Sequence, residues 1–250
     1  MNVSFGDSQG IAADANQNIL LAGIVSDAPA HVQGRLIRVD PGGNQQLLAS
    51  SSLFAFDRVA LEASGQILAT NGFLNTPGVA RIDPVTGAVS VLSSGGILPY
   101  GLEDIEVESG GSIVVVGTIG YGPARRQPEL VRINPATGAQ TPVPGSTILD
   151  FAIAGIAWVS GMTSDGAGGF FLVGGPDASC DEDCPGAVYH LTAAGQLSAL
   201  TDLVVSTPMD IAIVPAPEPE TLLLVGLGLA PLVRRSPGLP GRGRSATSRA

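Results

Sequence analysis

The composition of this 250-residue chain excludes several classes of protein before any motif is considered. Only 14% of its residues are charged, against about 25% in a typical globular protein. All 12 basic residues are arginines, and five of them lie in the last 17 residues. The net charge of −10 argues against nucleic acid as a partner, because phosphate binding requires a basic face. The 34 glycines and 19 prolines argue against a helical bundle, so a turn-rich β protein remains.

The chain begins without the features of a secretory signal. Residues 1–12 contain neither a basic segment nor the apolar stretch that a signal peptide requires. Taken alone, this start predicts a cytoplasmic protein, whereas the C-terminal segment 215–235 predicts an exported one.

Four segments share one plan: an apolar stretch, an acidic residue, a small-residue turn and a second apolar run. They are residues 10–23, 58–72, 104–118 and 161–175. The acidic residues are spaced 48, 46 and 57 apart, and the second run always begins five residues after them. These acidic residues are Asp14, Glu62, Glu108 and Asp165. Such a constant offset indicates a tandem repeat.

A second hairpin is predicted after each of these segments, in residues 36–48, 79–92, 130–143 and 188–200. Turns such as Asp-Pro-Val-Thr-Gly suit a hairpin, because Pro fixes φ and Gly accepts a positive φ. The alternation of apolar and polar residues places one polar residue of each third strand on the opposite face from its apolar neighbours. We interpret these residues as outward-facing; they are Arg38, Arg81, Arg132 and His190. Four strands per repeat is the unit of a β-propeller blade.

The pattern R-[IV]-[DN]-P-x-[TG]-G resembles NHL-like, SMP-30-like and streptogramin-lyase-like β-propellers over residues 10–214. We therefore expect an all-β chain with about four four-stranded blades in residues 1–214. A β-sandwich is the rival fold, but it does not explain a tandem repeat. Residues 210–214 repeat the opening strand at 104–108 and predict the start of a fifth blade. Either four blades close the ring imperfectly, or the chain is a larger propeller truncated at its N-terminus.

The segment 215–235 contains a Pro-Glu-Pro triplet, 13 uncharged residues and two arginines, in that order. It resembles the PEP-CTERM sorting signal of exopolysaccharide-producing Gram-negative bacteria. The residues that carry the resemblance are Pro217, Glu218, Pro219, Arg234 and Arg235. The resemblance implies processing by an exosortase, a membrane protease, and a destination in the periplasm, at the outer surface or in the extracellular matrix.

A short hydrophobic helix over 221–233 would reach about 20 Å, less than the ~30 Å of a bilayer core. Such a segment suits transient insertion in the inner membrane, and the two arginines would remain in the cytoplasm. A buried C-terminal core helix is the alternative. The usual architecture includes a signal peptide, so we expect the start of this chain to be truncated or misassigned. Residues 236–250 form a basic tail with the composition of a disordered segment.

Variable loops are expected at 24–34, 72–78, 118–129 and 174–186, and we expect ligands to bind at the face where they gather. The last loop contains Cys180 and Cys184, for which a local disulfide is the favoured interpretation in an exported protein. Free thiols are the alternative, and a zinc site lacks further ligands. Asp181 and Asp183 are weak candidates for calcium, against the simpler interpretation of a solvated acidic loop.

The densest acidic run places Asp104, Glu106 and Glu108 on one face of a strand. Lactonases of the SMP-30-like group bind a divalent metal near the central channel, so Asp104 and Glu106 are weak metal-site candidates. The alternative, which we favour, is that Glu108 is the acidic turn residue of the repeat. His31 alone in a loop does not support a lyase mechanism.

These observations predict an exported, envelope- or matrix-associated propeller with a non-catalytic binding or structural role. Whether it is an enzyme stays open, with the weight against it, and no catalytic residue is assigned. The partners implied are the exosortase and, as ligand, an exopolysaccharide or envelope protein. The alternative function is a metal-dependent lactonase or lyase of the same fold.

Overall fold

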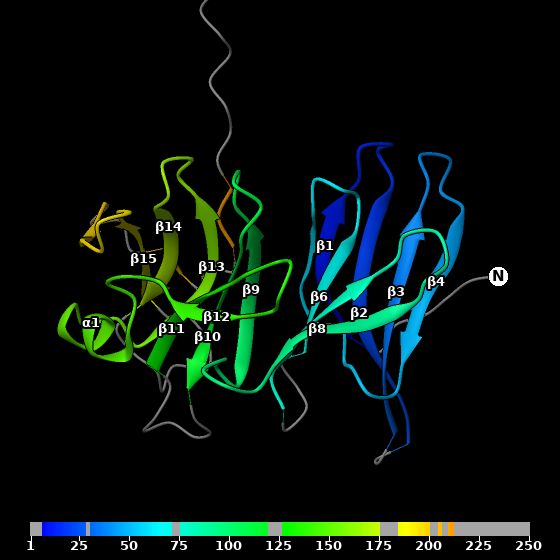
Figure 1. The fold of residues 1–250 in the computed structure, drawn as a ribbon, viewed down its shortest axis with the longest axis horizontal. Coiled ribbons are helices and arrows are strands. Elements are labelled where there is room, and N and C mark those ends of the chain that lie inside the picture. The colour runs from blue at the N-terminus through cyan, green and yellow to red at the C-terminus, as the bar shows by residue number, and fades with distance from the viewer. Residues whose placement is uncertain are drawn as a thin grey trace, which may run out of the picture. The chain divides into compact units, whose positions relative to one another are not determined.

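A computed structural model describes residues 7–28, 31–71, 76–119, 127–175, 185–200, 205–206 and 210–212. These residues belong to one compact unit that ends at Ala212. The first 16 strands form four antiparallel sheets, each with four strands in sequence order. We number these sheets as blades 1–4 (Figure 1).

The blades have the following strands. Blade 1 contains β1 (Asp7–Ala13), β2 (Ile19–Ala28), β3 (His31–Val39) and β4 (Gln45–Ser51). Blade 2 contains β5 (Val59–Leu61), β6 (Ile67–Asn71), β7 (Gly78–Ile82) and β8 (Val89–Ser94). Blade 3 contains β9 (Gly101–Val107), β10 (Ile113–Ile119), β11 (Gln127–Ile133) and β12 (Gln140–Pro142). Blade 4 contains β13 (Trp158–Ser164), β14 (Phe170–Gly175), β15 (Pro185–Leu191) and β16 (Leu197–Ala199), and β17 (Val205–Ser206) pairs with β15.

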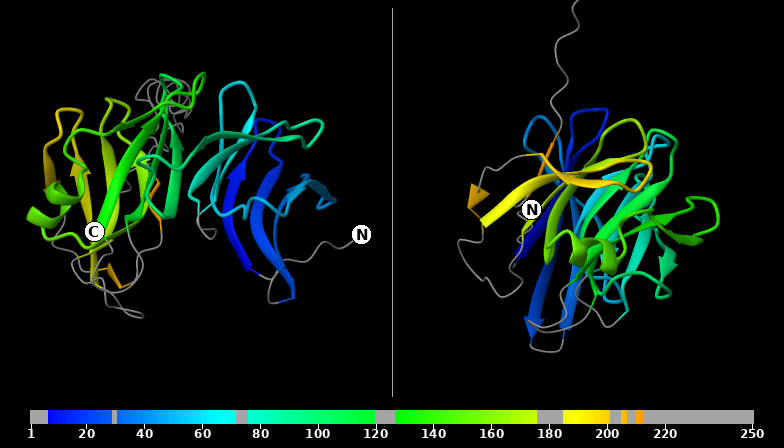
Figure 2. Two further views of the ribbon diagram at one scale, coloured as in Figure 1. Left: turned by 60° about the horizontal axis from the view of Figure 1, so that its bottom comes forward. Right: turned by 90° about the vertical axis from the view of Figure 1, so that its left-hand side faces the viewer.

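Each of blades 1–3 packs one sheet face against the next blade, as the alternation of side chains along a strand allows. We call the face toward the preceding blade the leading face and the opposite one the trailing face. Three apolar clusters fill the junctions 1–2, 2–3 and 3–4. At the first junction, Leu20 and Leu36 of blade 1 meet Ile67 and Ile82 of blade 2. Figure 2 shows the blue strands of blade 1 beside the cyan strands of blade 2.

In blades 2 and 3 the glycine of the β-hairpin turn between strands three and four fixes the spacing of a junction. Gly87 and Gly138 have φ of 71° each, and a Cβ there would lie 1.9 Å from the Leu48 carbonyl oxygen and 2.1 Å from that of Leu92. These oxygens belong to the preceding blade, so backbone meets backbone. Gly43 occupies the same turn in blade 1, and nothing lies within 4 Å of its Cβ position.

The structure differs from the sequence-based expectations in two segments. The predicted loop at 24–34 is mostly strand, because β2 continues to Ala28 and β3 begins at His31. The crossing between blades 3 and 4 contains an unpredicted six-residue helix, α1 (Ile148–Ile153). The Asp150 carboxylate accepts hydrogen bonds from the Thr147 N–H and hydroxyl, which holds the first turn. Phe151 is fully buried in the cluster of the 3–4 junction, which explains why so short a helix forms here.

The remaining predicted elements lie outside the described residues. These are the hydrophobic helix over 221–233, the tail 236–250 and the loop that carries Cys180 and Cys184. No helix in the described part of the chain is long and apolar enough to cross a membrane. What is described confirms an all-β chain: a β-propeller-like array of four four-stranded blades.

Candidate functional site

The opening strands of all four blades line one pocket of about 340 Å³, together with residues 210–212. Equivalent positions of the repeat face it, because Ile11, Val59, Ile105 and Met162 each occupy the same place on β1, β5, β9 and β13. Ile211 occupies the same place on the segment 210–212. The pocket is therefore where the four blades and the start of a fifth come together.

The segment 210–212 has the position expected for the opening strand of a fifth blade. A Cβ on Gly161 of β13 would lie 2.8 Å from the Asp210 Cα. At the 1–2 junction, a Cβ on Gly10 of β1 would lie 2.9 Å from the Arg58 Cα. The glycine thus allows the next opening strand to approach in both places. Asp210 also repeats a detail of Asp104, since each carboxylate accepts a hydrogen bond from the next residue's N–H.

Asp104 is the most strongly perturbed acid that lines the pocket. Its Oδ2 accepts a hydrogen bond of 2.8 Å from the Met162 N–H, across the junction between β9 and β13. Its Oδ1 accepts one of 2.8 Å from the Ile105 N–H. Burial raises the pKa of the Asp104 carboxyl to about 7, and the negative charge of Asp210 acts in the same direction. A carboxyl of this kind exchanges its proton near neutral pH.

Glu106 lines the same pocket two residues further along β9. Burial raises its pKa as well, and the charge of Asp210 adds to the shift, while a hydrogen bond from the Ser164 backbone opposes it. The structure therefore brings Asp104, Glu106 and Asp210 to one pocket. The sequence singled out the first two, and the third follows from the repeat alignment of 210–214 with 104–108.

Glu108 does not share this site. It follows the end of β9 and closes the turn to β10, where its N–H donates to the Ser112 carbonyl. Its carboxylate forms a two-pronged ion pair with Arg132, at 2.8 Å from both Nε and Nη2. Glu108 thus serves the repeat as its acidic turn residue, the interpretation that we favoured from the sequence.

The polar residues of the third strands are not outward-facing, contrary to the sequence-based interpretation. Each lies on a trailing face, and in blades 2–4 it binds the acidic turn residue of its own blade. Arg81 binds Glu62 through Nε at 2.9 Å and Nη2 at 2.6 Å, and Nη2 also donates to the Pro135 carbonyl of blade 3. A propeller blade has neighbours on both faces, so alternation along a strand separates two junctions here and does not separate core from solvent.

His190 follows the same rule in blade 4. Its Nε2 lies 2.9 Å from the Asp165 Oδ2, and its ring stacks on Phe171 with 4.8 Å between ring centres. The hydrogen bond to His190 contributes to a lowered pKa of Asp165, against burial.

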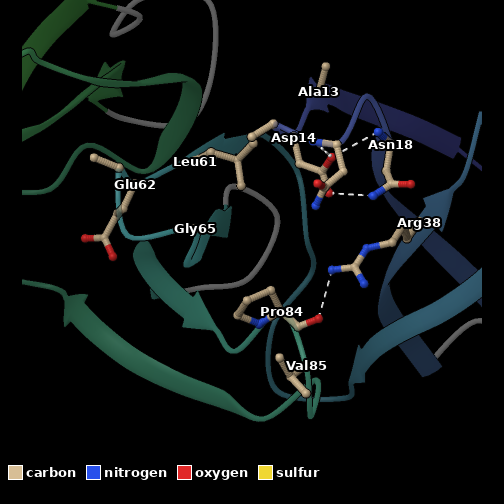
Figure 3. Close-up of a pocket in the computed structure, with 12 residues that line it drawn as sticks. Ala13, Asp14, Asn18, Arg38, Leu61, Glu62, Gly65, Pro84 and Val85 are labelled. Atoms are coloured by element: carbon tan, nitrogen blue, oxygen red, sulfur yellow. Dashed lines mark hydrogen bonds between the residues drawn. The ribbon is translucent and has the colours of Figure 1, made fainter.

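Blade 1 departs from this arrangement at a second pocket, of about 570 Å³, between blades 1 and 2 (Figure 3). Asp14 is one methylene shorter than the glutamates of blades 2 and 3, and its carboxylate binds Asn18 at 2.8 Å. Arg38 donates from Nη2 to the Pro84 carbonyl at 2.8 Å, while its Nε is buried and has no hydrogen-bond partner within the described ranges. The side chain of Asn18 thus holds the carboxylate that an arginine holds in blades 2 and 3, and it lowers the pKa of Asp14.

The residues around the central pocket do not fit a metal centre. Among the residues that the structure describes, no group of three or more His, Cys, Asp or Glu side chains is arranged to hold a metal ion. Asp181 and Asp183, the other candidates, lie outside the described residues, as do the tips of the predicted ligand-binding loops.

Comparison with known proteins supports the fold. No family model matches the sequence, and no curated protein matches it. Among solved structures, TolB from Acinetobacter baumannii is 15% identical, with a TM-score of 0.53, over 82% of this chain and 46% of that one. A puromycin-hydrolyzing peptidase of Mycobacterium tuberculosis is 12% identical, with a TM-score of 0.51, over 84% of this chain and 31% of that one. This chain therefore spans less than half the length of either protein.

A gluconolactonase from Xanthomonas campestris is also similar, at 13% identity and a TM-score of 0.46 over 82% of this chain and 78% of that one. At these identities, similarity to the first two structures bears on the fold alone. The class that the sheets and the similar structures define is a β-propeller-like repeat protein.

Proposed function

We propose that this chain is an exported, non-catalytic β-propeller-like binding protein of the cell envelope or extracellular matrix of a Gram-negative bacterium. The observation behind the binding role is the carboxylate-lined central pocket. Asp104 and Glu106 of blade 3 and Asp210 of the segment 210–212 gather there, whereas the positions of blade 1 equivalent to Asp104 and Glu106 carry Gly10 and Ala12. Residues that differ between repeats and face a shared pocket are better explained by a ligand than by the fold.

The ligand that suits this pocket carries hydroxyl groups or a positive charge. Carboxylates accept hydrogen bonds from hydroxyls, and partly buried carboxylates gain from a cationic partner. An exopolysaccharide or a basic segment of an envelope protein both meet this requirement. The test is binding of purified full-length protein to exopolysaccharide of the producing strain, by isothermal titration calorimetry. Glu106→Gln is expected to weaken binding at least tenfold, and unchanged binding would refute the assignment of the pocket.

Export rests on the segment 215–235, with its Pro-Glu-Pro triplet and paired arginines. We propose that an exosortase recognises this segment while 221–233 is transiently inserted in the inner membrane. Replacement of Pro217, Glu218 and Pro219 by alanine is expected to retain the protein in the inner-membrane fraction. The matched control replaces Pro237 and Pro240 in the tail, which is expected to leave the fractionation unchanged.

One observation favours a second candidate, an enzyme of the lactonase or lyase type. A carboxyl whose pKa is raised to about 7 at a pocket is suited to proton transfer near neutral pH. Lactone hydrolysis that is lost in Glu106→Ala and in Asp104→Asn would establish this candidate. Sensitivity of that activity to chelators would show whether a metal takes part.

A further inference from the structure

Arg38 of blade 1 is a third-strand polar residue that lacks an acidic partner. In blades 2–4 the residue at this position binds the acidic turn residue of its own blade. Within the described ranges, Arg38 forms neither a hydrogen bond nor an ion pair with Asp14. Its Nη2 donates to the Pro84 carbonyl at 2.8 Å, and its Nε is buried without a partner there. Because a guanidinium has five N–H donors, most of its donors are not used by the described residues.

Blade 2 shows which group completes an arginine at this position. Arg81 donates to the Glu62 carboxylate from Nε at 2.9 Å and from Nη2 at 2.6 Å. Its Nη2 also donates to the Pro135 carbonyl of blade 3, as Arg38 donates to the Pro84 carbonyl of blade 2. The planar fork of a guanidinium matches the two oxygens of a carboxylate. What blade 1 lacks at Arg38 is therefore a carboxylate.

Asp14 does not supply this carboxylate, because its own turn holds it. Its Oδ1 accepts hydrogen bonds of 2.9 Å from the N–H groups of Asn16 and Asn18, and its Oδ2 accepts one of 2.8 Å from the Asn18 side chain. The side chain is also one methylene shorter than that of Glu62. Figure 3 shows the Asp14–Asn18 pair beside the guanidinium of Arg38. The position that the glutamate carboxylate takes in blade 2 is therefore not taken by Asp14 in blade 1.

A pocket large enough for a small ligand lies at this place. Its volume of about 570 Å³ falls within the range of roughly 300–1,000 Å³ that small-molecule sites occupy. Arg38 is partly exposed and lines the pocket together with turn residues of blades 1 and 2. Glu62 lines it too, but Arg81 compensates its charge, and its carboxylate points away from Arg38 (Figure 3). Arg38 is thus the positive group of this pocket that a ligand can reach.

We propose that this pocket binds a uronic acid, with the sugar carboxylate on the guanidinium of Arg38. The Asp14 carboxylate selects the rest of the ligand. A carboxylate has about four acceptor positions, and three hydrogen bonds reach this one, so it can accept one hydroxyl group more. Its negative charge opposes a second anionic group at the same place. A single carboxylate surrounded by hydroxyls meets both conditions, whereas a doubly charged phosphate does not.

The apolar lining residues suit a sugar ring. Leu61, Ala63 and Val85 line the blade 2 side of the pocket, and Val85 is 86% exposed. They offer hydrocarbon surface to the less polar face of a pyranose, beside the few polar groups that fix its orientation. Of the residues that the structure describes, only Leu61 lines both this pocket and the central one, so the proposal does not rest on the ligand proposed there.

The experiment is isothermal titration calorimetry of the full chain with D-glucuronate. For a ligand of this size with one charged contact, a dissociation constant of about 1 mM is expected. Methyl glucoside has the same ring without the carboxylate, and it is expected to bind at least tenfold more weakly. Arg38→Gln is expected to weaken glucuronate binding at least tenfold, because it removes the positive charge and the fork of donors.

Arg35→Gln is the matched control. Arg35 lies on the same strand as Arg38 but on the opposite face, where it bonds Gln33, and it does not line the pocket. The control variant loses the same charge, so it is expected to leave the dissociation constant of glucuronate unchanged. Circular dichroism and thermal unfolding confirm that each variant is folded.

Asp14→Glu tests the geometry without removing the arginine. The added methylene should let the side chain reach Arg38 and form the two-pronged pair of blades 2 and 3. Glucuronate binding is then expected to fall at least tenfold while the urea midpoint of unfolding shifts upward, a combination that a misfolded variant cannot give.

Four outcomes would each overturn the proposal. They are no glucuronate binding by the wild type, equal binding of methyl glucoside, unchanged binding in Arg38→Gln, and undiminished binding in a stabilised Asp14→Glu variant. Tighter binding of N-acetylglutamate than of glucuronate would also overturn it, and would identify an acidic protein side chain as the ligand.

Discussion

The blade junctions and the central pocket follow opposite rules. At the junctions the same parts recur, because Glu62 with Arg81 and Glu108 with Arg132 form the same two-pronged pair. At the pocket the position of Asp104 varies, and blade 3 is the one described blade with a carboxylate there. Equivalent residues there are Gly10, Arg58, Asp104 and Gly161 in blades 1–4. The recurring glutamate–arginine pairs stabilise the fold, and the residues that vary between blades determine the chemistry of the pocket.

The contrast between the junctions and the pocket also explains why the pKa of Asp104 is raised. A carboxylate that pairs with an arginine is stabilised in its charged form, while one that is buried near other carboxylates is stabilised in its neutral form. Asp104 belongs to the second kind, because it is buried and lies near Asp210. Substitutions at the blade junctions and at the central pocket therefore test this contrast independently.

The largest effect is expected from the pH dependence that Asp104 creates. Burial raises its pKa from 3.8 to about 7 in the folded chain, so the folded state holds this proton where the unfolded state has lost it. The free energy of unfolding should therefore fall as the pH rises from about 4 to 7, by up to about 4 kcal/mol. Asp104→Asn should remove most of this slope in urea unfolding measured at several pH values, and the raised pKa of Glu106 accounts for part of the slope that remains.

Asp40→Asn is the control for this measurement. Hydrogen bonds from Asn44 lower the pKa of Asp40, so its own contribution is lost only as the pH falls below the ordinary range of a carboxyl. The fall in the free energy of unfolding between pH 4 and 7 should persist in Asp40→Asn. A wild-type protein with constant stability across that range would show that Asp104 is ionised and solvated.

The next effect concerns the turn glycines. In Gly138→Ala, a methyl group would face the Leu92 backbone oxygen at 2.1 Å with φ at 71°, so both strain and overlap oppose it. A loss of about 2–4 kcal/mol in unfolding free energy is expected. Gly43→Ala has φ at 81° and open space, so only the strain of about 1 kcal/mol should remain. Equal losses in the two variants would mean that blade 1 has a neighbour at this turn.

The sequence predicted the repeated region well. The five-residue offset after Asp14, Glu62 and Glu108 identified the turns, and Asp-Pro-Val-Thr-Gly identified the hairpin ends. These signals are local, so they can be seen without knowing which blades touch. The same local view placed Arg81 and His190 outward, because alternation along one strand does not show that a second blade lies on each side.

The pocket was predicted less well, because it depends on contacts between segments far apart in the chain. Asp104 stood out as part of an acidic run, and the repeat already identified Glu108 as its acidic turn residue. What no local pattern shows is the Met162 N–H, 58 residues away, which donates a hydrogen bond to Asp104. The short helix α1 was missed for a similar reason, since Phe151 is buried by the junction of blades 3 and 4.

A smaller effect is expected at the ion pairs of the junctions. Glu108→Gln leaves Arg132 without a charged partner, and both side chains are mostly buried, at 14% and 29% exposed. A loss of about 1–2 kcal/mol is expected in urea unfolding. In Asp14→Asn the contact from Arg38 to Pro84 is retained, so a loss below about 1 kcal/mol is expected. A larger loss in Asp14→Asn than in Glu108→Gln would contradict the contrast between blade 1 and blade 3.

The smallest effect is expected at Gln17, the one described residue other than glycine with a positive φ, at 63°. Its equivalents Gly65, Gly111 and Gly168 have φ of 84°, 84° and 89°, so the repeat places a glycine where blade 1 has glutamine. Gln17→Gly should raise the free energy of unfolding by about 0.5–1 kcal/mol, because a side chain disfavours this conformation. Gly111→Gln, which has open space, should lower it by a similar amount. If Gln17→Gly is neutral or destabilising, the side chain of Gln17 makes an interaction that offsets the strain of its positive φ. Glutamine at this turn of blade 1 would then be stabilising.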